Sequence, residues 1–192
     1  MPYRHKSFQD ASYGRIASAN SFIDRIAGLQ QIAKQYSYMD LDRVGIIGCD
    51  GITSPVYGLL EHPEFYKVGV MANFEDSRFT AASWGELFEG VVSPNPHHKI
   101  LDAELLIASL RGKLLLIHGM IDYSTPASAT LRLVEAMRQA NKDFDLLLLP
   151  NGGHEISSYV LRRTWDYLVR HLQGIEPPKE FKLTTSWDII FL

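Results

Sequence analysis

Short apolar runs alternate along the chain with segments whose hydrophobic positions recur at helical spacing. The runs are nearly continuous, which is typical of strands buried on both faces of a parallel sheet. They cover residues 44–47, 68–72, 113–117 and 144–149. Helical spacing covers residues 21–36, 54–61, 126–141 and 161–172. The order predicts an α/β fold, with a mostly parallel sheet of at least four strands and helices on both faces.

Element boundaries follow from a few local signals. Ser54 followed by proline is typical of a helix start, with Ser54 as the cap. The last helix carries a stripe of Leu161, Trp165, Leu168 and Leu172, and Gly174 predicts its end.

Residues 74–110 interrupt the alternation and predict an excursion over one end of the sheet. Such an excursion either walls a pocket or simply covers hydrophobic surface. The whole chain, residues 1–192, is predicted to form one domain that includes this excursion and a C-terminal tail at 179–192. The apolar end of that tail can add an edge strand, cover the sheet flank or dock a partner.

Composition narrows the function classes. A chain of 192 residues with 46% hydrophobic content suits one domain with a sizeable core. The net charge of −3 gives no electrostatic reason to expect nucleic acid or an anionic membrane as a partner. No apolar run approaches the length of about 20 residues that spans a bilayer. The single cysteine excludes an internal disulfide, and adjacent His97 and His98 lack metal-ligand spacing, so no metal or cofactor is expected.

One turn has the form of a hydrolase nucleophile site. Residues 43–51 predict a buried strand that runs into a sharp glycine turn, where hydrolases mount a nucleophile. No serine stands in this stretch. The pattern therefore indicates an acyl-transfer scaffold whose chemistry has been removed or replaced.

Several longer stretches carry a family resemblance. They are residues 38–48, 62–70, 115–119, 141–150 and 152–155, followed by 165–172 and 174–178. Together they resemble the catalytic domain of the prolyl oligopeptidase and dipeptidyl-peptidase family of serine peptidases. The resemblance implies an α/β-hydrolase fold that lacks the leading strands of the usual sheet.

The same resemblance supplies candidate site residues. The family's elbow is Gly-x-Ser-x-Gly-Gly, and the matching stretch here starts at Gly48 and is one residue shorter. The serine is therefore deleted or replaced by Asp50. Gly51 is the candidate backbone donor to an oxyanion, and His154 matches the family's catalytic histidine.

The carboxylate that should orient the histidine is expected at the second of two tandem acidic residues. Here that pair reads Asp122-Tyr123, so the resemblance places the triad position at Tyr123 and makes Asp122 its noncatalytic neighbour. An alternative has Asp122 reorient toward His154. His118 is expected to be structural, and Cys49 to be a core residue at a strand end.

Two hypotheses follow. The favoured one is a noncatalytic peptidase homologue that binds a peptide, or that forms a homo-oligomer or a complex with another protein at an open sheet edge. The alternative is an active hydrolase, peptidase-like or esterase-like, that uses Asp50 with His154 and Asp122.

Overall fold

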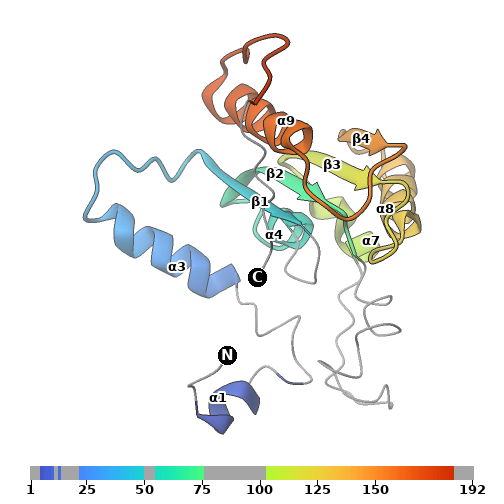
Figure 1. The fold of residues 1–192 in the computed structure, drawn as a ribbon. Helices are drawn as coiled ribbons and strands as arrows, with labels where there is room; N and C mark the ends of the chain where they lie inside the picture. Colours follow the sequence, from blue (N-terminus) through green and yellow to red (C-terminus); the bar gives the residue numbers. More distant parts are fainter. Residues whose placement is uncertain (1–4, 11–12, 14–21, 50–54, 76–102, 184–192) are drawn as a thin grey trace.

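A parallel sheet forms the centre of the molecule. The structure is a computed structural model that describes residues 5–10, 13, 22–49, 55–75 and 103–183. The strands are β1 (Val44–Cys49), β2 (Tyr66–Ala72), β3 (Lys113–Gly119) and β4 (Asp145–Leu149). They are hydrogen-bonded in the order β1-β2-β3-β4, and all three pairs are parallel (Figure 1). The predicted parallel α/β sheet is confirmed.

Helices cover both faces of the sheet, as predicted (Figure 1). One face packs against α4 and α8, and its core centres on Leu59, Met71, Leu114 and Met137. The other face packs against α9 through Val70, Ile117 and Val160. The helical elements are α1 (Lys6–Asp10), α3 (Phe22–Ala33), α4 (Pro55–Glu61), α7 (Ala103–Leu106), η1 (Ile107–Ser109), α8 (Ala127–Gln139), α9 (Ser158–Leu168) and η2 (Val169–Gln173).

The last helix ends where the sequence predicts. The helical course of α9 and η2 stops at Gly174, which adopts a left-handed φ of +69°. The predicted apolar stripe is wrong in part, because Trp165 is exposed. The buried residues of this helix are Val160, Thr164, Asp166 and Tyr167, and Val160, Thr164 and Tyr167 follow one another at spacings of about one turn. Ser157 caps α9 by accepting a hydrogen bond from the Val160 amide.

The predicted excursion at 74–110 lies mostly outside the described residues. Its described end forms α7 and η1, which contact α4. Lys142 donates to the carbonyl oxygens of Ala108 and Leu110, which ties η1 to the segment before β4. The proposed helix cap Ser54 and most of the tail, 184–192, also lie outside the described residues. The described helices include none long and apolar enough to cross a membrane.

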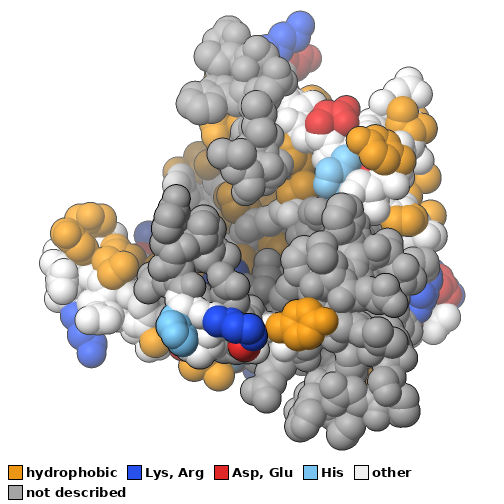
Figure 2. Space-filling view, turned by 60° about the horizontal axis from the view of Figure 1, so that its bottom comes forward, with side chains coloured by type: hydrophobic (Ala, Val, Ile, Leu, Met, Phe, Trp, Pro, Cys, Tyr) orange, Lys and Arg blue, Asp and Glu red, His pale blue; other side chains and the backbone are white. Residues whose placement is uncertain are grey.

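Hydrophobic side chains remain exposed around α3. Only Phe22 of this helix is buried, and its ring contacts those of His62 and Tyr66. Figure 2 shows hydrophobic side chains at the left, on the part of the molecule that carries α3 and the following turn. Tyr38 in that turn is 82% exposed. Much of this part of the molecule therefore contributes little to the core.

Candidate active site

A histidine and an aspartate meet at the carboxyl ends of β3 and β4. Asp122 lies in the loop after β3, and His154 lies in the loop after β4. Because parallel strands present their carboxyl ends at one edge of the sheet, the two loops are neighbours. His154 Nδ1 lies 2.9 Å from Asp122 Oδ2. The Asp122 side chain is fully buried, whereas that of His154 is 31% exposed.

The expected assignment of the acidic pair is wrong. Tyr123, which the resemblance placed at the triad position, is 91% exposed. Asp122, expected to be the noncatalytic neighbour, faces His154 instead. The sequence spacing alone cannot show this difference, because adjacent residues in a loop point in different directions and the loop backbone selects one.

Asp122 is held by four hydrogen bonds. Its Oδ1 accepts from the amides of Ser124 and Thr125, at 2.8 and 2.9 Å. Its Oδ2 accepts from the Thr125 hydroxyl at 2.7 Å, in addition to His154. Burial acts to raise the pKa of Asp122, but the hydrogen bonds from Thr125, His154 and Ser124 outweigh it and lower the pKa. The ionised carboxylate is only an acceptor, so Nδ1 of His154 carries the proton and Nε2 is left as the basic atom.

Asn73 is a residue of this site that sequence reasoning missed. It follows β2, is buried, and adopts a left-handed φ of +49°. Its Nδ2 donates to the His154 carbonyl at 2.9 Å, and its Oδ1 accepts from the Gly119 amide at 3.2 Å. Asparagine tolerates this backbone region better than most residues. An asparagine directly after a buried strand is the signal that could have drawn attention to it.

The loops that carry the pair also bind each other. The Met120 amide donates to the Leu149 carbonyl, and the Ile121 amide donates to the Gly152 carbonyl. A side chain on Gly119 would meet the carbonyl oxygens of Gly152 and Gly153. The close approach of these backbones is what brings His154 to Asp122, and it requires a glycine at the end of β3.

Comparison with known proteins places this arrangement in a family. The model of the prolyl oligopeptidase family matches residues 3–174. The chain belongs to the prolyl oligopeptidase family. The resemblance deduced from the sequence is confirmed.

Similar members of the family include dipeptidyl peptidases. The chain is 29% identical to dipeptidyl peptidase 8 of Mus musculus over 144 residues, which are 69% of this chain and 16% of the relative. It spans less than a fifth of that protein.

Solved structures of similar proteins show which fold this chain has. The crystal structure of Porphyromonas gingivalis dipeptidyl peptidase 4 superposes with a TM-score of 0.73 at 25% identity, covering 84% of this chain and 24% of the other. Acylaminoacyl peptidase of Pyrococcus horikoshii gives a TM-score of 0.74 at 17% identity, covering 93% and 32%. The fold is the α/β-hydrolase fold of these peptidases.

The other predicted site residues, Asp50 and Gly51, directly follow β1 in the sequence. Asp50 and Gly51, the candidate nucleophile and oxyanion donor, lie outside the described residues, as do His97 and His98. Cys49 ends β1 and is half-buried, and the Asn73 amide lies 4.0 Å from its sulfur. Within the described part of the chain, no group of three or more His, Cys, Asp or Glu side chains has the geometry of a metal site.

His118 is buried in the core beside this site, and its contacts agree with the structural role expected for it. Its Nε2 lies 3.0 Å from the Thr125 carbonyl and its Nδ1 lies 2.7 Å from the Thr130 hydroxyl. A carbonyl only accepts, so Nε2 carries the proton and Nδ1 accepts from Thr130. His118 thus supports Thr125, which in turn binds Asp122.

Burial of His118 predicts a loss of stability at mildly acidic pH. Burial lowers the pKa of His118 below its ordinary value despite the nearby Thr125 carbonyl and Asp122. As pH falls below about 6.5, the unfolded chain binds a proton that the folded chain resists, so the free energy of unfolding decreases. Urea titrations at pH 7 and 5.5 should show this decrease, and it should be smaller in His118→Gln. The half-buried His62→Gln provides the control. Equal pH dependence in the unsubstituted protein and His118→Gln would contradict the assignment.

Proposed function

We propose that this domain is a hydrolase in which His154 acts as general base and Asp122 orients it. The contact of 2.9 Å between Nδ1 and Oδ2 carries the proposal. A base oriented by a buried carboxylate is the arrangement that triad hydrolases use to remove a proton from a nucleophile. The partial exposure of His154 leaves its ring accessible from solvent.

The nucleophile in this proposal is Asp50. β1 ends at Cys49 and Asp50 is the next residue in the sequence, so Asp50 follows the strand that carries the nucleophile in the family. Its carboxylate attacks the alkyl carbon of a substrate ester, the bond between that carbon and the ester oxygen breaks, and the acid leaves as a carboxylate while the alkyl group forms an ester with Asp50. His154 Nε2 then takes a proton from a water, and the resulting hydroxide cleaves the ester and regenerates Asp50. Asp122 stabilises the imidazolium that forms.

Turnover of alkyl ester substrates by the purified protein tests this proposal. We expect hydrolysis that His154→Ala and Asp50→Asn each abolish, whereas His62→Gln retains it. A single turnover in ¹⁸O-labelled water should leave label in the Asp50 carboxylate, because water attacks the ester at its carbonyl carbon. Hydrolysis that persists in Asp50→Asn without label would exclude Asp50 as nucleophile. Absence of all hydrolysis would exclude the proposal.

The second candidate function is the noncatalytic one, a domain that binds a peptide or assembles with another copy. The absence of serine from residues 43–51 favours it. Exposed apolar residues support assembly, since Ile47 on β1, an edge of the described sheet, is 55% exposed. Sedimentation velocity should then show a dimer that Ile47→Lys dissociates. A fluorophosphonate adduct on a serine would contradict both candidate functions.

A further inference from the structure

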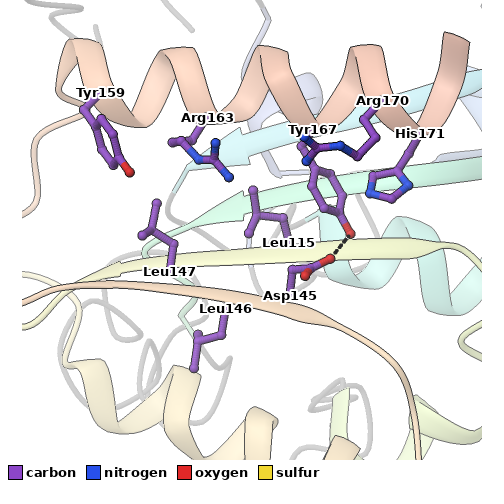
Figure 3. A pocket seen from close by; sticks show the side chains of 9 residues that line it. All are labelled: Leu115, Asp145, Leu146, Leu147, Tyr159, Arg163, Tyr167, Arg170 and His171. Carbon is purple, nitrogen blue, oxygen red and sulfur yellow. Dashed lines mark hydrogen bonds between the residues drawn. The ribbon is translucent and has the colours of Figure 1, made fainter. Parts of the chain in front are cut away.

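A hollow lies apart from the His154–Asp122 pair, between the last helix and the β4 side of the sheet (Figure 3). Its volume is about 350 Å³, which falls within the range of small-molecule pockets. We call it the α9 groove. Its lining residues are Leu115, Asp145, Leu146, Leu147, Tyr159, Arg163, Tyr167, Arg170 and His171.

The floor of the α9 groove is apolar. Figure 3 shows Leu115 of β3 and Leu147 of β4 on the side of the sheet that faces the helix, whereas Leu146 points to the opposite side. Leu115 and Leu147 belong to the core cluster under α9. An apolar ligand body placed here would leave water and extend that cluster.

The helix side of the groove carries two arginines. Arg163 and Arg170 are seven residues apart, which is about two helical turns, so they share one helix face. Figure 3 shows their guanidinium groups turned toward each other above the leucine floor. Two guanidinium groups that face each other can both donate to one anion that lies between them. Guanidinium groups also match the planar geometry of a carboxylate.

The ion pairs of the two arginines leave room for such an anion. Arg170 donates to the Glu176 carboxylate through Nε and Nη2, at 3.2 and 3.0 Å, so its guanidinium geometry already suits a carboxylate. The Glu176 side chain is 80% exposed, and an exposed pair of this kind contributes little stability. Arg163 Nη1 reaches Asp166 only at 3.4 Å. A ligand carboxylate can therefore replace Glu176 at small cost.

The sheet side of the groove, below Arg170, carries Asp145, whose charge orients the ligand (Figure 3). Asp145 Oδ2 accepts from the Tyr167 hydroxyl at 2.9 Å. Burial, with this hydrogen bond to the Asp145 carboxylate, raises the pKa of Tyr167, so its hydroxyl stays protonated and remains a donor. The negative charge of Asp145 repels an anion. The anionic end of a ligand is thus directed toward Arg163 rather than toward Asp145.

We propose that the α9 groove binds a small organic carboxylate with an apolar body. The carboxylate lies between Arg163 and Arg170, and the apolar body lies on Leu115 and Leu147. This site is separate from the proposed hydrolytic site, since its lining includes neither Asp122 nor His154.

Three probes with the same phenyl group and the same number of chain carbons, but different end groups, test the proposal on the full chain: 4-phenylbutyrate, 4-phenylbutanol and 4-phenylbutylamine. Affinities are measured by NMR titration, with the amides of β4 and α9 as reporters. We expect the carboxylate to bind about tenfold or more tightly than the alcohol, and the amine more weakly still. Similar affinities for all three probes, or no binding of the carboxylate, would overturn the proposal.

Matched charge variants test the two arginines. Arg163→Met and Arg170→Met should each weaken 4-phenylbutyrate binding about tenfold, because each removes one charge-assisted hydrogen-bond donor. Arg132→Met removes the same charge from α8, where Arg132 pairs with Glu104, and should leave the affinity unchanged. Equal affinities in the Arg163→Met, Arg170→Met and Arg132→Met proteins would show that general charge, and not this groove, attracts the probe. The affinity of each variant for 4-phenylbutanol is measured as well. A variant that folds poorly should lose affinity for the alcohol too, whereas loss of the arginine contact alone should weaken only the carboxylate.

Discussion

Replacing Gly119 by alanine is expected to destabilise the protein by about 3 kcal/mol and to separate His154 from Asp122. The added Cβ would meet the carbonyl oxygens of Gly152 and Gly153, which are backbone atoms that cannot rotate away. The end of β3 and the loop after β4 must then move apart. Urea denaturation measures the loss of stability, and the His154 side-chain NMR signals report the displacement.

Gly28→Ala is the matched control for this substitution. Gly28 lies inside α3, and a Cβ at this position would meet nothing within 4 Å. Alanine favours a helix interior over glycine, so this variant should be more stable by about 0.5–1 kcal/mol. A Gly119→Ala protein as stable as Gly28→Ala would show that the two loops tolerate separation.

Asp122→Asn is expected to reverse the tautomer of His154 and to lower the hydrolytic rate about 10³–10⁴-fold. The amides of Ser124 and Thr125 require an acceptor, so the asparagine must turn its Oδ1 toward them. Its NH₂ group then faces His154, which has to accept at Nδ1 and carry its proton on Nε2. The atom that should remove a proton is thereby blocked.

Imidazole ¹⁵N chemical shifts distinguish the two tautomers, and they do so whether or not the protein has activity. The unsubstituted protein should show a protonated Nδ1 and Asp122→Asn a protonated Nε2. Asp42→Asn, an exposed carboxylate in another loop, should keep the original tautomer. If His154 keeps a protonated Nδ1 in Asp122→Asn, the carboxylate does not orient the ring. A changed tautomer with no activity in either protein would favour the noncatalytic candidate.

The sequence predicted the central architecture because the signals are local or periodic. The four strands match the runs at 44–47, 68–72, 113–117 and 144–149. The two central strands, β2 and β3, are buried and nearly continuous in apolar residues, because a strand covered on both faces must be apolar. The end of the last helix could be read from Gly174, since glycine adopts the left-handed conformation readily. The stripe that this helix buries was less predictable, because Trp165 is large and apolar yet lies exposed.

The site was predicted less completely, because it depends on how three loops converge. His154 could be identified from its motif, but the choice between Asp122 and Tyr123 could not. That choice depends on the turn in which the Ser124 and Thr125 amides bind Asp122. Asn73 has no distinguishing spacing, and its role follows from two contacts to residues that lie 46 and 81 positions further along the chain.

By itself, the sequence determined the fold class, the family and the presence of a histidine at the carboxyl end of the sheet. Each of these follows from patterns or motifs within short contiguous segments. The tertiary structure alone decided which carboxylate meets that histidine and that Asn73 ties the two loops together. It also decided that two arginines converge over a leucine floor. The physical reason is that side-chain direction in a loop is set by hydrogen bonds and close contacts to distant backbone, which no local pattern encodes.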